Sequence, residues 1–242
     1  MSLTITQTID GTQVQPNGVL RLSALLSLFQ KAAELDLQDL GISVTAMIDG
    51  GLSFVVTKMT LHFLGDIRVG DTVSVETRPR PVHGFSFPRD YIVRRDGEKL
   101  VECSSVWALI DIHSRKLAPP SALEPFGVIP PDTDEPISLP RIIAARQLTQ
   151  PERTDERRVY PSMLDRNRHV NNARYGDFVY DYLPDSENTT YCGRYFLMEY
   201  HTEMKLDDIC SVSAGTQDGK WQTIGLNAQT NQIIFRSVLD FS

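Results

Sequence analysis

The segment 165–175, DRNRHVNNARY, contains the residue types with the most chemical potential in this chain. Asp165, Asn167 and His169 stand at alternate positions, directly before a helical pattern begins. A carboxylate, an amide and an imidazole on one loop can activate a water molecule and stabilise an oxyanion. The unpaired backbone N–H groups of a helix N-terminus point toward the same place. We therefore interpret this segment as a hydrolytic site.

Each of these three residues also has a purely structural interpretation. Asp165 alone fits a turn or helix entry, Asn167 alone fits a turn, and His169 alone fits a packed histidine. Their occurrence together at the start of a helix favours a functional role. Asn171 and Asn172 follow, and asparagine is a residue type that caps helix N-termini, so we expect these two to fix the helix start.

A second polar group lies in the segment MEYHTEM, where Glu199, His201 and Glu203 alternate. In a strand these three side chains would share one face. That face could point to solvent, or it could deliver a glutamate to the loop of Asp165. We expect no metal, because His201 and Glu203 lack further ligands at a suitable spacing.

Several other chemistries have no motif in this sequence. GFSFP at 84–88 lacks the final glycine of a serine nucleophile elbow, and no phosphate-binding glycine loop or dinucleotide fingerprint occurs. We therefore expect no cofactor.

The bulk composition indicates a globular protein. Hydrophobic residues make up 41% and charged residues 23% of the 242 residues. No apolar run reaches the length of a membrane span, and the polar N-terminus does not resemble a signal or transit peptide. The net charge of −7 argues against a nucleic-acid partner. Cys103, Cys192 and Cys210 show no metal-like or redox-like pairing. We expect reduced thiols and a cytoplasmic location.

The chain divides into two similar halves. Seven of the 14 prolines lie between Pro119 and Pro140, which predicts a stiff connector. Apolar residues recur at helical spacing in 19–41 and again in 172–183. Strand-like segments follow each helix, at 52–63, 71–80, 85–95 and 98–112 and at 195–206, 208–216, 220–229 and 232–241. This order predicts an α+β fold in which an antiparallel sheet covers each helix.

Sequence details indicate that the halves are copies. The motif Met59-Thr-Leu-His62 matches Met198-Glu-Tyr-His201. Placing Val170 on Val19 puts Asp165, Asn167 and His169 opposite Val14, Pro16 and Gly18. On that alignment the first copy lacks the acid, the amide and the imidazole, and serves as scaffold or pocket.

At this point the sequence resembles a known family. The pattern D-x-N-x-H-V-N-N-x-x-Y at the start of a helix is similar to the motif of hot-dog thioesterases. The doubled unit and the segment E-Y-x-x-E resemble the acyl-acyl-carrier-protein thioesterases, of the FatA/FatB type and their bacterial relatives, from about residue 4 onward. The resemblance implies a tandem double hot-dog. We expect an N-terminal hot-dog domain over 1–118 with the acyl pocket, a linker over 119–145 and a catalytic C-terminal domain over 146–242.

The resemblance also implies roles for individual residues. Asp165, Asn167, His169 and Glu203 fall on the family's catalytic positions. Our hypothesis is that Glu203 and His169 activate water, that Asn167 positions the water or the carbonyl group, and that Asp165 orients the loop. Either carboxylate could serve as the base.

Further residues complete the expected site. Backbone N–H groups near Asn171 and Asn172 would receive the oxyanion. Met204 stands where plant members carry a cysteine, so a cysteine nucleophile is not available. Arg166 and Arg168 are candidates for docking acyl carrier protein, which is acidic.

The resemblance implies hydrolysis of fatty acyl-acyl carrier protein, and two other functions stay open. One is an acyl-CoA thioesterase of the same fold. The other is an acyl-binding or dehydratase-like hot-dog module without hydrolytic activity. Because a double hot-dog contains its own pseudo-dimer interface, either a monomer or a homodimer is compatible with the sequence.

Overall fold

One continuous antiparallel sheet forms the framework of the protein. The computed structural model describes residues 2–185 and 189–240, and ten strands in that part pair in the order β1-β3-β4-β5-β2-β7-β10-β9-β8-β6. The strands of the first half are β1 (Leu3–Thr8), β2 (Leu52–Phe63), β3 (Thr72–Pro79), β4 (Ser86–Arg95) and β5 (Glu98–Asp111). Those of the second half are β6 (Arg153–Arg158), β7 (Arg194–Tyr200), β8 (Ile209–Gln217), β9 (Lys220–Asn227) and β10 (Ile233–Asp240).

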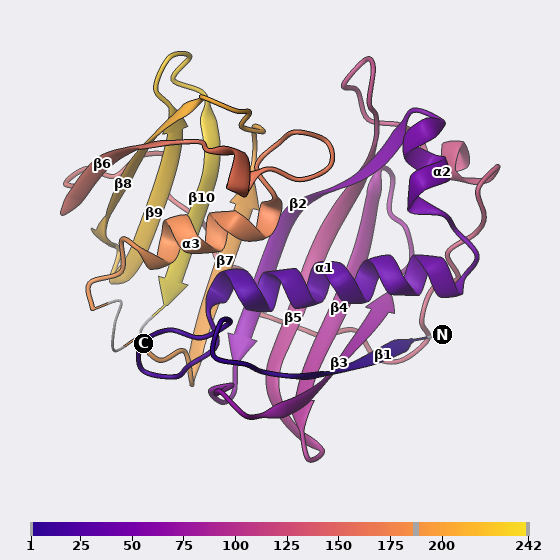
Figure 1. Ribbon diagram of the computed structural model, residues 1–242, viewed down its shortest axis with the longest axis horizontal. Coiled ribbons are helices and arrows are strands. Elements are labelled where there is room, and N and C mark those ends of the chain that lie inside the picture. Colours follow the sequence, from indigo (N-terminus) through magenta and orange to yellow (C-terminus); the bar gives the residue numbers. More distant parts are fainter. Residues whose placement is uncertain (1, 186–188, 241–242) are drawn as a thin grey trace.

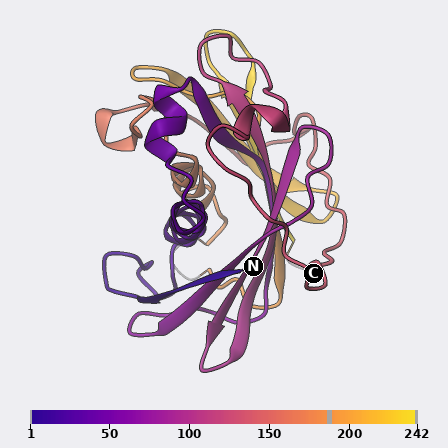
Figure 2. The same cartoon turned by 90° about the vertical axis from the view of Figure 1, so that its right-hand side faces the viewer.

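The helices lie on one face of this curved sheet (Figures 1 and 2). The α-helices are α1 (Leu22–Asp39), α2 (Val44–Asp49) and α3 (Tyr175–Tyr180), and the 3-10 helices are η1 (Pro120–Leu123), η2 (Pro161–Met163) and η3 (Asn172–Arg174). No helix of the described residues is long and apolar enough to cross a membrane. The arrangement of helix on sheet, repeated in each half, confirms the predicted α+β hot-dog class.

The two halves meet where β2 pairs with β7. Met59 lies opposite Met198 in this pairing, so the repeated motif that the sequence contains sits at the centre of the sheet. The two short sheets that the duplication predicts are therefore one sheet. Figure 1 shows α1 and α3 following one another across the same face.

Helix α1 buries its apolar stripe on the sheet. Phe29 is fully buried, and its ring stacks on Tyr91 of β4 with 4.7 Å between the ring centroids. The helix ends where Gly41 takes a φ of +76°, a left-handed conformation that glycine adopts without strain and that stops helices. The predicted helix of 19–41 is thus confirmed, with slightly shorter ends.

The second helix is shorter than the sequence predicts. Residues 172–183 form the 3-10 turn η3 followed by the six residues of α3. Pro184 disfavours helical backbone at the residue before it, so the helix ends early. Gly176 lets α3 approach α1 closely, because a Cβ at this position would lie 2.7 Å from the backbone nitrogen of Ser23.

The strand predictions are correct in the interior of the sheet and incomplete at its edges. Strand β2 has the predicted bounds, whereas β7 ends at Tyr200, earlier than the predicted 195–206. The edge strands β1 and β6 were not predicted. The sequence of β6, RTDERR, has charged residues at five of its six positions and no apolar alternation. Phe241, in the last predicted strand, lies outside the described residues.

Beyond η1, whose Leu123 packs with Ile42 and Met47, the proline-rich connector runs along the sheet face opposite α1 (Figure 2). The guanidinium of Arg80 donates a hydrogen bond to the carbonyl oxygen of Asp134, and Ile142 packs against Leu197 and Val238. Between η1 and β6 the connector contains no helix or strand. The division into 1–118, 119–145 and 146–242 stays a prediction.

Candidate active site

The carboxylate of Asp165 organises the loop that precedes η3. Its Oδ1 accepts hydrogen bonds from the backbone N–H groups of Asn167 (2.8 Å) and His169 (3.2 Å). The Asp165 N–H donates to the carbonyl oxygen of His169 at 2.8 Å, and Arg168 takes a φ of +61°. The chain therefore closes into a tight turn, with the acid at its centre.

This turn brings His169 next to Glu203. An isolated bridge joins His169 to Lys205, and the Val170 N–H donates to the carbonyl oxygen of Met204 at 2.8 Å. As a result, Nε2 of His169 lies 3.4 Å from Oε2 of Glu203. The His169 side chain is 16% exposed and that of Glu203 is 34% exposed, so the pair stays within reach of solvent.

The expectation that Glu199, His201 and Glu203 share one strand face is wrong. Strand β7 ends at Tyr200, and the N–H of His201 donates to the carbonyl oxygen of Ile234 as the chain turns away. Glu199 forms an ion pair with Arg236 at 2.9 Å and lies 3.7 Å from His201. Glu203 alone of the three reaches the loop of Asp165.

Arg115 is a neighbour of the site that sequence reasoning missed. It belongs to the turn after β5, where it takes a φ of +59°, and its Nη2 donates a hydrogen bond to Oε2 of Glu203. The residue comes from the first half, 88 positions before its partner. No local pattern could indicate this contact, because it depends on the pairing of β5, β2 and β7.

The surroundings of His169 favour its neutral form. Burial lowers the pKa of the imidazole below its ordinary value of 6.5, and the positive charges of Arg115 and Lys205 lower it further, while the carboxylate of Asp165 acts in the opposite direction. A neutral imidazole can accept a proton near neutral pH. The short distance between His169 and Glu203 and the lowered pKa of His169 together allow this pair to act as a general base.

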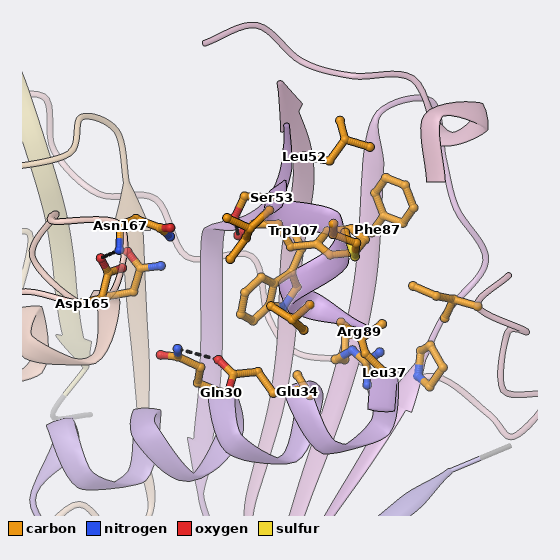
Figure 3. A pocket seen from close by; sticks show the side chains of 18 of the residues that line it. Gln30, Glu34, Leu37, Leu52, Ser53, Phe87, Arg89, Trp107, Asp165 and Asn167 are labelled. Atoms are coloured by element: carbon orange, nitrogen blue, oxygen red, sulfur yellow. Dashed lines mark hydrogen bonds between the residues drawn. The ribbon is translucent and has the colours of Figure 1, made fainter. Parts of the chain in front are cut away.

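A cavity of about 740 Å³ adjoins the loop. Asp165 and Asn167 stand at one end of it, and Leu52, Phe87 and Trp107 line it farther along (Figure 3). The rest of its wall comes chiefly from α1, α2, β2 and β4 of the first half. Its size is typical of small-molecule sites, and its wall combines apolar side chains with amide and charged groups. His169 and Glu203 are not among the residues that line it.

The start of η3 also borders the cavity. Asn171 caps this turn as predicted, because its Oδ1 accepts the N–H of Ala173 at 2.9 Å. The Asn171 N–H already donates to the carbonyl oxygen of Met163 at 2.9 Å, so it is not available to an oxyanion. The N–H of Asn172 donates to no acceptor within residues 2–185 and 189–240.

The first half contains a counterpart of this loop, in a different register from the predicted one. The Gln15 N–H donates to the carbonyl oxygen of Val19 at 2.8 Å, which is the bond that Asp165 makes to His169. Gly18, at a φ of +80°, then corresponds to Arg168. The alignment of Val170 with Val19 is therefore wrong by one residue, since the apolar pattern of the helices does not fix the register of the loops before them.

In the corrected register the first copy keeps the amide. Asn17 corresponds to Asn167, whereas glutamine and valine replace the acid and the imidazole. The side chain of Asn17 donates to the carbonyl oxygen of Thr189 at 3.0 Å, and that of Gln15 donates to the hydroxyl oxygen of Tyr191 at 3.0 Å. Residues 189–192 thus cover the counterpart loop, while the loop of Asp165 adjoins a cavity.

Comparisons with known proteins agree with this geometry. Residues 6–121 match the model of the acyl-ACP thioesterase N-terminal domain, and residues 147–238 match that of the C-terminal domain. The chloroplastic dodecanoyl-[acyl-carrier-protein] hydrolase of Cinnamomum camphora is 24% identical over 231 residues, which are 87% of this chain and 59% of that enzyme. The chain spans about half the length of the curated plant relatives it matches.

Two solved structures share the fold. The acyl-ACP thioesterase from Bacteroides thetaiotaomicron superposes with a TM-score of 0.78 at 21% identity, over 100% of this chain and 98% of that one. The 12:0-ACP thioesterase from Umbellularia californica gives a TM-score of 0.78 at 23% identity, over 99% of this chain and 96% of that one. Because the two domain models together match most of its length, this chain belongs to the acyl-ACP thioesterase family.

Proposed function

We propose that this protein hydrolyses the thioester of fatty acyl-acyl carrier protein, releases the free fatty acid and thereby ends chain elongation. The observation that carries this proposal is the placement of His169 and Glu203 beside a loop whose Asp165 and Asn167 line a cavity with apolar side chains farther along its wall. Family membership supplies the substrate class. The cavity would hold the acyl chain, with the thioester at the loop.

The reaction needs an activated water and no covalent intermediate with the protein. The neutral imidazole of His169, paired with Glu203, takes a proton from the water as its oxygen attacks the thioester carbon. The C–S bond then breaks, and the proton passes to the leaving sulfur. Asn167 positions the water or the carbonyl group, and the N–H of Asn172 receives the developing oxyanion.

Of the two carboxylates, Glu203 is the better partner for the base. Asp165 Oδ1 already accepts two backbone N–H groups, so this acid orients the loop. Met204 is fully buried, and its thioether has no S–H to ionise, so it cannot act as a cysteine nucleophile would; we assign the attack to water.

The carrier protein would dock against the positively charged rim of the site. Arg166 and Arg168 are exposed on the loop, and Arg166 also lines the cavity. Acyl carrier protein is acidic, so these guanidinium groups would steer it to the cavity mouth despite the net charge of −7.

Thiol release measured over a series of acyl chain lengths, on both acyl carrier protein and coenzyme A, tests this function. The proposal predicts faster release from the carrier protein, with a rate that falls as salt rises. Faster release from coenzyme A would instead identify an acyl-CoA thioesterase. Binding of acyl chains without thiol release would identify a non-catalytic module.

Location and assembly are proposals of the same kind. A cytoplasmic location fits the reduced state of Cys103, Cys192 and Cys210, which are all free thiols. The pairing of β2 with β7 joins the two hot-dog halves within one chain, so a monomer suffices and a homodimer is compatible.

A further inference from the structure

The cavity contains a buried cation far from the loop. Arg89 of β4 is 6% exposed and lines the cavity beside Leu37, Phe87 and Trp107. Figure 3 shows it at the side opposite Asp165 and Asn167. A cavity for a purely aliphatic chain would have no need of a charged group there, because burying a charge costs free energy unless the charge is matched.

Only part of the Arg89 guanidinium is used by the protein. Its Nη1 donates to Oδ2 of Asp36 on α1 at 2.6 Å and to Oγ1 of Thr77 on β3 at 2.8 Å. These bonds tie the helix to the sheet and balance the charge. The N–H groups of Nε and Nη2 donate to no acceptor in the part of the chain that the structure describes.

Arg80, a second first-half arginine that lines the cavity, provides an internal comparison. Its Nε donates to Asp90 at 2.7 Å, its Nη1 to the carbonyl oxygen of Asp134 at 2.6 Å and its Nη2 to that of Glu135 at 3.0 Å. Each of the three nitrogens therefore has a protein partner, Nε on β4 and the other two on the connector. Every side-chain nitrogen of Arg80 thus donates a hydrogen bond within the described residues, whereas Nε and Nη2 of Arg89 do not.

We propose that the cavity accepts acyl chains that carry a hydroxyl group toward their distal end, and that Arg89 donates a hydrogen bond to this hydroxyl oxygen. The inference rests on the proposed function, because it names the class of acyl chain. A methyl group at the end of the chain would shield the free N–H groups of Arg89 from water without accepting a hydrogen bond. A hydroxyl oxygen at the same place would accept a hydrogen bond from one of these N–H groups.

A hydroxyl group fits this position better than a carboxylate does. The positive charge of Arg89 is already matched by Asp36 at 2.6 Å, and Glu34 also lines the cavity. A second carboxylate would therefore meet like charges, while a neutral acceptor uses the spare donors without a net change in charge.

The test is a competition between two substrates in one tube. One substrate is acyl carrier protein with an ω-hydroxyacyl chain, and the other is carrier protein with the unsubstituted chain of the same carbon number. The experiment is repeated over a series of chain lengths, and mass spectrometry measures the amount of each released acid. At the length that places the hydroxyl at Arg89, we expect kcat/KM to be about tenfold higher for the hydroxylated chain, or about 1.4 kcal/mol.

Two variants link this preference to Arg89. The double variant Asp36→Asn/Arg89→Met removes the donors without leaving a buried unpaired charge, and the preference should fall to about one. The control Thr77→Val keeps both the guanidinium and Asp36, and should keep the preference. Because the ratio is measured within each sample, a partial loss of folded protein does not change it.

A binding measurement separates this inference from the proposed function. Calorimetry with the free ω-hydroxy acid and the matching unsubstituted acid requires no turnover. Tighter binding of the hydroxy acid, lost in the double variant, supports the inference even if no thioester is hydrolysed. Equal binding or hydrolysis of the two chains at every length, or a preference that survives the loss of Arg89, overturns it.

Discussion

Replacing Arg115 by methionine should move the acid limb of the pH–rate profile upward. Arg115 Nη2 donates to the same Glu203 oxygen that lies 3.4 Å from Nε2 of His169, so with a hydrogen bond of about 2.8 Å the two nitrogens are at most about 6 Å apart. Two unit charges at about 6 Å repel by about 0.7 kcal/mol in water and about 2.8 kcal/mol at an effective dielectric constant of about 20. The Arg115 side chain is 45% exposed, which favours the lower figure, or about half a pH unit.

The direction of the shift follows from the charges around the imidazole. Burial and then Arg115 hold the pKa of His169 below its ordinary value, so the loss of Arg115 raises this pKa. Glu203, no longer paired with Arg115, favours the protonated imidazole and acts in the same direction. His169 then gains its proton at a higher pH, and kcat/KM for acyl-acyl carrier protein begins to fall about half a pH unit earlier as the pH is lowered.

The measurement is kcat/KM against pH at low and high salt. The shift should shrink at high salt, because screening weakens the repulsion between exposed charges. Arg68→Met is the matched control, since Arg68 is 50% exposed and pairs with Asp66 away from the loop of Asp165. An acid limb that stays in place in the Arg115 variant, or moves to lower pH, would show that Arg115 does not lower the pKa of His169.

Three further predictions concern packing, docking and the thiols. Gly176→Ala should lower the free energy of unfolding by about 1–3 kcal/mol in a urea titration, because the new Cβ would lie 2.7 Å from the backbone of α1. Gly11→Ala is the control: its new Cβ would have no atom within 4 Å, so the free energy of unfolding should stay nearly the same. The pair Arg166→Ser/Arg168→Asn should raise KM for acyl-acyl carrier protein several-fold at low salt without lowering kcat, and wild-type turnover that is insensitive to salt would contradict the docking proposal. Iodoacetamide should label the exposed Cys192 first and leave turnover intact. The thiols of Cys103 and Cys210 are buried, and burial raises the pKa of each. Loss of activity when Cys192 alone is labelled would contradict catalysis by water.

The sequence predicted those features of the site that depend on neighbouring residues. Asp165, Asn167 and His169 form one turn because the carboxylate accepts N–H groups two and four positions ahead, which is a local interaction. The bounds of β2 were also predictable, because a long apolar strand at the centre of a sheet has a strong pattern. Glu203 was assigned by resemblance, whereas the argument from a shared strand face was wrong, since β7 ends at Tyr200.

The remaining features depend on contacts between segments that lie far apart in the sequence. Arg115 meets Glu203 only because the two halves join through β2 and β7, and Arg89 meets Asp36 only because α1 crosses β4. The register of the first-half loop was missed for a related reason. Apolar periodicity locates a helix but does not fix the register of the polar turn before it, and only the backbone bond from Gln15 reveals the match.

The role of Glu203 as the partner of the catalytic base is measured by the rate of thioester hydrolysis of Glu203→Gln compared with that of Glu199→Gln. The two glutamates lie close in sequence, but only Glu203 reaches His169, at 3.4 Å, while Glu199 pairs with Arg236 at 2.9 Å. With circular dichroism confirming that both variants are folded, we expect a loss of kcat of roughly 10²- to 10⁴-fold for Glu203→Gln and little change for Glu199→Gln. Near-normal thiol release by the folded Glu203 variant would contradict this role.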